Sequence, residues 1–320
     1  MQEPILFNFA TKELSQEAFF CWLFSWAEEK YKATKIYSIA KNFLKDIIQE
    51  EIDIKSIEVI QQFKKIDFYI RINENITIVF EGKVKTSEHS NQLERYREII
   101  SKKYPEDKLF FVYLKTSILF SDESFCVKES KYIVYDLFAI YNKLPKKTNN
   151  AIYNDYMNYL AQKVKSYQNF DKIRYSNWGQ NEWIGLCYKL QSEIKDSAFF
   201  NIWQGREVYW GIMESDFLLD KNMWASLEIK HSLGNNDGRL CILLHIKDGR
   251  LNKYSIRDEL KIKFEKIFIN ESIEISNRIG EQTNFIRFND FPILKNGFID
   301  FIKTKEYLNK IIKVFESKVK

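Results

Sequence analysis

Two short apolar segments separated by a polar turn form the clearest pattern along the chain. Residues 66–72 and 76–84 are each long enough for a strand and are rich in isoleucine, phenylalanine and valine. Between them lies Asn73-Glu74-Asn75, a polar triplet of the kind that closes a β-hairpin. The pattern therefore predicts two antiparallel strands joined by a tight turn.

The position of this turn fixes which side chains share a face of the hairpin. If the middle residue of the triplet is the centre of the turn, Phe68 faces Phe80 and one side of the hairpin is apolar. Residues at the alternate positions point the other way. Asp67 is then opposite Glu81, and Lys83 is on the same side as both.

Apolar periodicities surround the hairpin on both sides. A helix is predicted from Ser15, as its N-cap, through a dense apolar stripe that contains the acid Glu17. A second helix is predicted from about Ser87 and ends before Pro105. The other elements expected here are helices at residues 36–48, 136–143 and 151–167 and strands at 57–63, 108–114 and 132–135. Helix, three antiparallel strands, helix, strand is an order typical of an α/β domain.

The pattern changes after about Phe170, where tryptophan becomes frequent. Runs of alternating polarity that predict antiparallel strands lie at residues 201–212, 225–231 and 240–246. A lysine-rich amphipathic helix is expected over residues 306–318. We therefore predict two domains, residues 1–172 and 173–320, of which the second is of the α+β class.

Composition narrows the class of protein only modestly. Of 320 residues, 45% are hydrophobic, which is enough for a packed core, and the net charge of +5 permits contact with a polyanion without requiring it. The four cysteines are scattered with no Cys-x-x-Cys pair, which argues against a zinc or iron–sulfur site. No basic leader opens the chain and the apolar run at residues 18–27 is too short to span a bilayer, so we expect a cytoplasmic protein.

The polar face of the hairpin carries the groups that phosphodiester hydrolysis needs. Asp67, Glu81 and the main-chain carbonyl of Gly82 are a suitable ligand set for Mg²⁺, with Mn²⁺ as a substitute. Lys83 would then lie beside the metal-bound water and stabilise the charge that develops on the phosphate. The same residues also fit the solvated face of an ordinary hairpin. The predicted convergence of three such groups favours catalysis.

These residues resemble the motifs of the PD-(D/E)XK nuclease superfamily, and most of all those of its RecB-like members. The matching elements are Asp67, Glu81-Gly82-Lys83 and Gln92-Leu93-Glu94-Arg95-Tyr96, the last of which reproduces a Q-x-x-x-Y element. The likeness covers about residues 10–140, and Ile66 stands where the name of the superfamily has proline.

The resemblance implies a restriction-endonuclease-like core in which the two hairpin carboxylates bind metal and Lys83 is catalytic. Gln92 and Tyr96 would position the phosphate backbone or brace the site, although simple packing also accounts for Tyr96. Glu17 would match an acid that such proteins carry on their first core helix. A position at the solvent edge is the alternative for Glu17.

The expected function is a metal-dependent nuclease that acts on DNA, in phage defence or DNA processing. The second domain would recognise a target or a partner protein. Association of two copies of the chain into a homodimer is an alternative to a partner protein. A ribonuclease of the same fold and an inactive module that binds nucleic acid or protein are the alternatives. Other polar residues are better explained without a role in catalysis. We interpret His231 and His245 as structural residues, and we expect exposed loop positions for Lys85, Thr86, Ser87 and His89.

Overall fold

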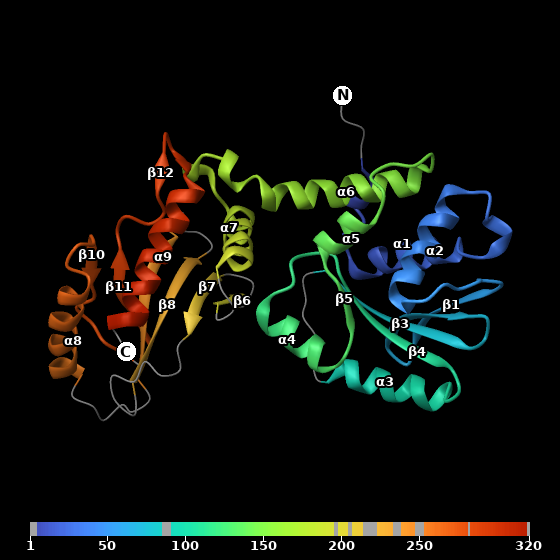
Figure 1. Cartoon of the computed structure of the whole chain (residues 1–320), viewed down its shortest axis with the longest axis horizontal. Coiled ribbons are helices and arrows are strands. Elements are labelled where there is room, and N and C mark those ends of the chain that lie inside the picture. Colours follow the sequence, from blue (N-terminus) through green and yellow to red (C-terminus); the bar gives the residue numbers. More distant parts are fainter. Residues whose placement is uncertain are drawn as a thin grey trace. The chain divides into compact units, whose positions relative to one another are not determined.

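The computed structural model describes residues 5–84, 91–194, 198–203, 207–213, 223–232, 238–246, 253–280 and 282–318. The chain divides into two compact units, Met1–Lys165 and Ser166–Lys320. Each unit has a large sheet of its own (Figure 1).

The first unit is built on a five-stranded mixed sheet with the order β1-β2-β3-β4-β5. The first three strands are antiparallel, whereas β3, β4 and β5 run parallel, which confirms the predicted α/β order. A parallel step needs a crossover, and a helix between β3 and β4 provides it. The strands are β1 (Ile57–Phe63), β2 (Ile66–Ile72), β3 (Ile76–Lys83), β4 (Lys108–Lys115) and β5 (Ile133–Tyr135).

The β2–β3 hairpin has the register that its polar turn predicts. Phe68 pairs with Phe80, and the turn residues Asn73 and Glu74 have φ values of 49° and 60°. Positive φ at both central residues suits the twist of a tight hairpin turn. The two phenylalanine rings stack with their centroids 4.6 Å apart. The buried apolar face therefore fixes the register together with the turn.

Helices cover both faces of this sheet (Figure 1). On one face, Phe24 of α1 stacks on Phe80 with centroids 5.0 Å apart, and Phe43 of α2 packs against Phe24. On the other face, α3 and α4 enclose a core cluster that includes Tyr69 and Val127. The helices are α1 (Glu13–Ser25), α2 (Lys35–Ile48), α3 (Gln92–Lys103), α4 (Ser121–Glu129), α5 (Leu137–Lys143) and α6 (Ala151–Gln168), the last of which continues beyond the unit boundary.

Two helices of this unit differ from the expectation. The N-cap of α1 is Lys12 and not Ser15, because the helix starts earlier and takes Glu13 into its first turn, where a carboxylate is favoured by the helix dipole. The predicted start of α3 at Ser87 lies outside the described residues, and the described helix begins at Gln92. The short helix α4 was not predicted from the sequence, because its apolar side chains form no continuous stripe.

The second unit contains a six-stranded antiparallel sheet with the order β10-β11-β9-β8-β7-β6. The run predicted at residues 201–212 is two strands, since β6 and β7 pair antiparallel within it. The strands are β6 (Ala198–Trp203), β7 (Glu207–Met213), β8 (Met223–Ser232), β9 (Arg239–Ile246), β10 (Ile273–Ile275) and β11 (Gln282–Phe288), beside a small hairpin of β12 (Leu294–Lys295) and β13 (Phe298–Ile299). Three helices complete the unit: α7 (Gln180–Glu193), α8 (Lys253–Ile267) and α9 (Phe301–Lys318).

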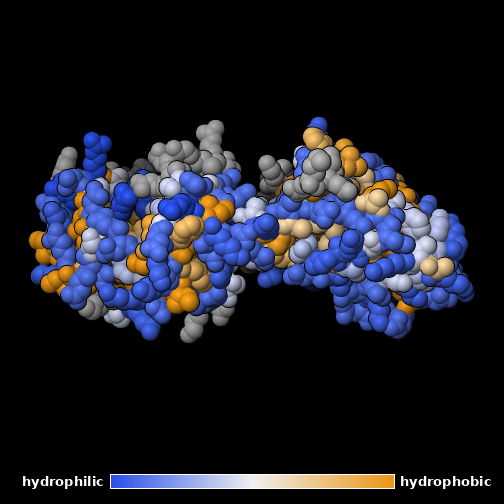
Figure 2. Space-filling view, turned by 90° about the horizontal axis from the view of Figure 1, so that it is seen from above, coloured by the Kyte–Doolittle hydropathy of each residue, from blue (hydrophilic) through white to orange (hydrophobic). Residues whose placement is uncertain are grey.

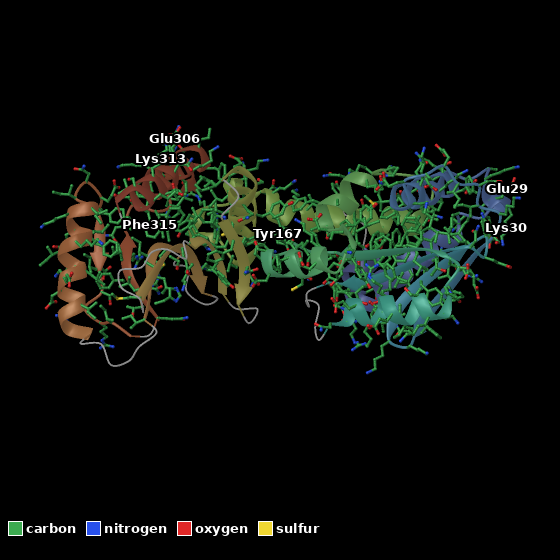
Figure 3. The ribbon with its side chains drawn as sticks, turned by 60° about the horizontal axis from the view of Figure 1, so that its bottom comes forward. Glu29, Lys30, Tyr167, Glu306, Lys313 and Phe315 are labelled. Atoms are coloured by element: carbon green, nitrogen blue, oxygen red, sulfur yellow. The ribbon has the colours of Figure 1, made fainter. Side chains whose placement is uncertain are left out.

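The last helix, α9, is amphipathic as predicted, although it begins earlier, at Phe301. Glu306 and Lys313 are exposed, whereas Phe315 is fully buried (Figure 3). His231 and His245 are both buried in the sheet of this unit, and His231 stacks on Trp183 of α7 with centroids 5.1 Å apart. These are environments typical of structural histidines.

The face of the surface in Figure 2 is mainly hydrophilic, with small apolar patches. Some large apolar side chains are exposed singly, such as Phe9 and Phe125, which is normal for a folded protein. Among the described residues, we find no helix with the length and apolar character that crossing a membrane requires.

The stacked phenylalanines should be essential to the stability of the first unit. Phe80 is 0% exposed and its ring lies against those of Phe68 and Phe24. We expect Phe80→Ala to lower the free energy of unfolding by about 3–5 kcal/mol, because it leaves a cavity between the hairpin and α1. Denaturant unfolding measures this change. As a control, Phe125→Ala removes a ring that is 67% exposed and should cost less than about 1 kcal/mol; equal costs would contradict this packing.

Candidate active site

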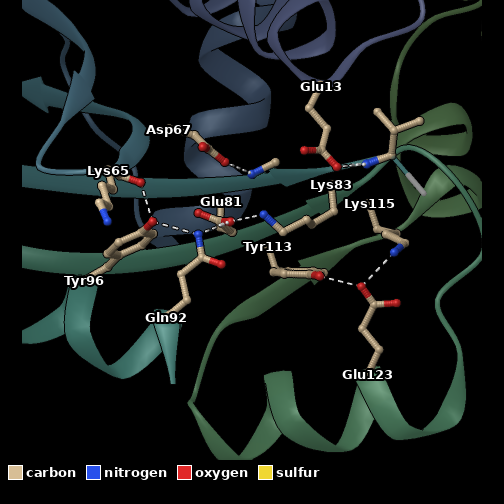
Figure 4. Close-up of polar contacts among 12 residues, drawn as sticks. Glu13, Lys65, Asp67, Glu81, Lys83, Gln92, Tyr96, Tyr113, Lys115 and Glu123 are labelled. Atoms are coloured by element: carbon tan, nitrogen blue, oxygen red, sulfur yellow. Dashed lines mark hydrogen bonds and ion pairs between the residues drawn. The ribbon is translucent and has the colours of Figure 1, made fainter. Parts of the chain in front are cut away.

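Asp67 lies on β2 where the hairpin register brings it next to the end of β3. Its Oδ2 accepts a hydrogen bond of 2.8 Å from the main-chain N–H of Gly82. The carboxylate thus reaches across the hairpin to the strand that carries Glu81 and Lys83, and the three predicted residues lie together (Figure 4).

Glu81 is the centre of the site and is 0% exposed (Figure 4). Its Oε1 accepts a hydrogen bond of 2.8 Å from Gln92 Nε2 and forms an ion pair with Lys83 Nζ. Its Oε2 is buried and has no hydrogen-bond partner in the described part of the chain. One carboxylate oxygen is therefore fixed by two donors, while the other has the environment of a ligand that lacks its cation.

Gln92 and Tyr96 connect α3 to this carboxylate. They are four residues apart and share a face of the helix, so Gln92 Nε2 also donates to the Tyr96 hydroxyl at 2.7 Å. The Tyr96 hydroxyl in turn donates to the main-chain carbonyl of Lys65. The two side chains therefore join α3, the start of β2 and Glu81. Of the two roles expected for them, positioning the phosphate backbone and bracing the site, these contacts fit the second.

Glu17 reaches the site from α1 and lies directly against Gly82. A β-carbon at position 82 would be 3.1 Å from Glu17 Cγ, a tight contact that would displace Glu17 by a few tenths of an ångström, and 3.7 Å from Asp67 Oδ2, an ordinary contact distance. Glu17 is 4% exposed, which rules out the solvent edge, and its Oε2 has no hydrogen-bond partner among the described residues.

A small cavity of about 10 Å³ lies next to Glu17. Gln16 and Thr116 also line it, and Gln16 Oε1 and Thr116 Oγ1 have no hydrogen-bond partner in the described residues. The volume is about that of one water, and several polar atoms face it. We infer that this cavity has the size and chemistry to hold a single water behind the carboxylates.

Comparison with known proteins agrees with this geometry. A model of the PD-(D/E)XK nuclease superfamily matches residues 6–180, which is more than half of the chain. The chain belongs to the PD-(D/E)XK nuclease superfamily. The matched region includes the hairpin, Glu17 and α3. No curated protein and no solved structure matches the chain.

In this member of the PD-(D/E)XK superfamily, the buried carboxylates oppose one another's ionisation. Burial, followed by the charge of Asp67, raises the pKa of Glu81 to about 8 and the pKa of Glu17 to about 7. Burial also raises the pKa of Asp67, although the N–H of Gly82 acts against it. Without a cation, Glu17 and Glu81 therefore hold protons up to near neutral pH, and a divalent cation would replace those protons.

The donor set fits a hard cation. Among the described residues, no three His, Cys, Asp or Glu side chains are already arranged as a metal cluster. The orphaned oxygens of Glu17 and Glu81 nevertheless point to oxygen ligation, and Mg²⁺ commonly uses one or two carboxylates and keeps several waters. The residues present therefore fit the metal that the superfamily implies.

A second buried ion pair lies beside the predicted site residues. Lys115 on β4 is the register partner of Lys83, and its Nζ is 2.7 Å from Glu123 Oε1. Tyr113 also donates to this oxygen (Figure 4), and burial lowers the pKa of Lys115. Sequence reasoning missed this pair because Glu123 belongs to the unpredicted helix α4.

Glu13 is the other residue that the sequence patterns did not indicate. Its carboxylate accepts a hydrogen bond of 3.2 Å from the main-chain N–H of Val84, just past the Glu-x-Lys strand. It lies one helical turn before Glu17, and that i, i+4 spacing was the available signal. The predicted loop candidates Lys85, Thr86, Ser87 and His89 lie outside the described residues.

The buried carboxylates predict an unusual pH dependence of stability. Since folding raises the pKa of Glu81 from 4.5 to about 8, its contribution to stability is complete below the lower value and is lost as the pH rises through the higher one. With a metal chelator present, we expect the melting temperature to fall between about pH 5 and pH 8. In Glu81→Gln this fall should be smaller, and melting curves recorded across that range measure it.

Glu29→Gln is the matched control, because Glu29 is an exposed carboxylate between α1 and α2 (Figure 3). It should leave the pH profile of the melting temperature unchanged. A Glu81→Gln profile parallel to that of the wild type would contradict the burial of an ionisable Glu81.

Proposed function

We propose that this chain is a divalent-metal-dependent nuclease that hydrolyses phosphodiester bonds in DNA. The observation that carries the proposal is a group of three carboxylates next to the ammonium group of Lys83: Glu17 and Glu81, which are buried, and Asp67, which is half-buried. Burying several negative groups together is costly unless a cation is bound among them. Membership of a nuclease superfamily supports the same class of reaction.

Asp67, Glu81 and the main-chain carbonyl of Gly82 are the groups that would hold Mg²⁺, with Mn²⁺ as a substitute. When bound, the cation supplies an acidified water and neutralises charge on the phosphate. Glu17 lies against the same glycine and would add negative charge to the metal-binding site. Gln92 would keep Glu81 in the correct rotamer through its hydrogen bond to Oε1.

Lys83 would act through its positive charge. Burial lowers its pKa, but the charges that Glu81 and Asp67 carry when ionised outweigh burial, so the net pKa is raised and the ammonium stays protonated at neutral pH. A protonated lysine stabilises negative charge on the phosphate oxygens and is not a base for water. The ion pair with Glu81 would hold its Nζ beside the cation.

The choice of DNA rests on the RecB-like Gln92–Tyr96 element, whose two side chains are joined to Glu81 through one hydrogen-bond chain. A role in phage defence or DNA processing is part of this proposal, with the second unit selecting the target or a partner. RNA cleavage by the same residues is the nearest alternative, and the assay below separates the two.

Cleavage should depend on Glu81 and Lys83. With Mg²⁺ or Mn²⁺, wild-type protein should cleave DNA, and Glu81→Gln and Lys83→Met should each lower the rate by about a hundredfold or more. The assay uses linear and circular DNA, single- and double-stranded, and the matching RNAs. Loss of cleavage with a chelator tests the need for metal.

Glu29→Gln and Lys30→Met make the same chemical changes at two exposed residues between α1 and α2 (Figure 3). Both should cleave at the wild-type rate. Folded wild-type protein that cleaves no substrate with either metal would overturn the enzymatic proposal in favour of an inactive binding module. Cleavage of RNA alone would replace DNA as the substrate.

A further inference from the structure

Two lysines form the turn that joins β1 to β2. Phe63 pairs with Ile66, so Lys64 and Lys65 are the whole loop, and their φ values are 49° and 72°. A two-residue turn with positive φ at both positions favours asparagine followed by glycine, because other side chains adopt this conformation at a cost. Both lysines are exposed. The backbone therefore gives no reason for lysine at either position, and a function of the two side chains explains them better.

The turn lies against α3, which adds two more exposed cations, Arg95 and Lys103. Lys103 Nζ is 4.6 Å from the centroid of the Phe63 ring, and Lys64 Nζ is 5.6 Å from the same centroid. The guanidinium of Arg95 is 5.5 Å from the centroid of the Tyr96 ring. We call the four cations of this surface the basic ridge: Lys64, Lys65, Arg95 and Lys103.

No carboxylate neutralises the charges of the basic ridge in the described part of the chain, where none of its four cations forms an ion pair. The four cations outnumber the two acids that α3 exposes beside them, Glu94 and Glu98. The dipole of α3 favours a lysine in its last turn, which accounts for Lys103 but not for the lysines of the hairpin turn. An anion bound along the ridge would reduce the repulsion among these charges.

The basic ridge is continuous with the nuclease site. The Tyr96 hydroxyl donates to the main-chain carbonyl of Lys65. Gln92 joins the same hydroxyl to Glu81 through two hydrogen bonds (Figure 4). Lys65 also lies two residues before Asp67 in the chain. A strand that enters the site can therefore pass along the ridge.

A nucleic-acid backbone is the anion that fits this arrangement. Cations spread over a turn and a helix match the regularly spaced phosphates of a strand better than they match one small anion. We propose that the basic ridge binds the sugar–phosphate backbone of the strand that the nuclease site cleaves. This inference rests on the proposed function and adds to it the route of the strand. Because the ridge contacts phosphates, it gives no sequence preference.

Binding of a short labelled single-stranded DNA and of the matching RNA to the full chain tests the proposal, with a chelator present to prevent cleavage. The variant Lys64→Asn/Lys65→Gly supplies the residues that the turn prefers, so its melting temperature should rise by about 2–4 °C. Its affinity should nevertheless fall by about tenfold or more at about 0.1 M salt. The slope of log Kd against log salt concentration should fall by about 1.4, because each phosphate contact contributes about 0.7.

Arg95→Gln/Lys103→Gln removes the same charge from the surface of α3 and should weaken binding to a similar degree, so it tests the ridge even if the turn variant is unstable. The control is Lys146→Gln/Lys147→Gln, which removes two consecutive exposed lysines between α5 and α6 and should bind like the wild type. Wild-type protein that binds neither strand, or ridge variants whose affinities match that of the control, would overturn the proposal. Ridge-dependent binding by a protein that cleaves no substrate would contradict the nuclease function and leave the ridge as a binding surface.

Discussion

The first unit depends on one electrostatic constraint, the burial of several carboxylates around the end of a single hairpin. Glu81 and Glu17 are almost fully excluded from solvent, and Asp67 beside them accepts a hydrogen bond from the N–H of Gly82. Burial, followed by the charge of Asp67, raises the pKa of both glutamates, so without a cation they hold protons up to near neutral pH. Burying ionisable carboxylates together is costly for folding, and the cation proposed above would offset that cost.

The rest of the unit keeps these groups in place. The stack of Phe24, Phe80 and Phe68 locks the hairpin register from one side, because a shift of one residue would expose the rings. From the other side, Gln92 and Tyr96 tie α3 to Glu81 and to the start of β2. The site is thus built on two strands and two helices, which are more rigid supports than loops.

Local patterns were sufficient to predict the centre of the site. The polar turn and the alternating hairpin determine which residues share a face, so the meeting of Asp67, Glu81 and Lys83 follows from the sequence alone. Glu13 and the Lys115–Glu123 pair could not be predicted in this way, since their positions depend on contacts between elements distant in the sequence.

We propose that the carboxylates of Glu17, Asp67 and Glu81 form a cation-binding site, and that this site holds protons when the metal is absent. Calorimetric titration with Mn²⁺ near neutral pH, repeated in buffers with different ionisation enthalpies, tests it most directly, because it counts the protons released on binding. The account predicts saturable binding with proton release, and loss of both in Glu81→Gln. Binding without proton release, or binding that Glu81→Gln leaves unchanged, would contradict it.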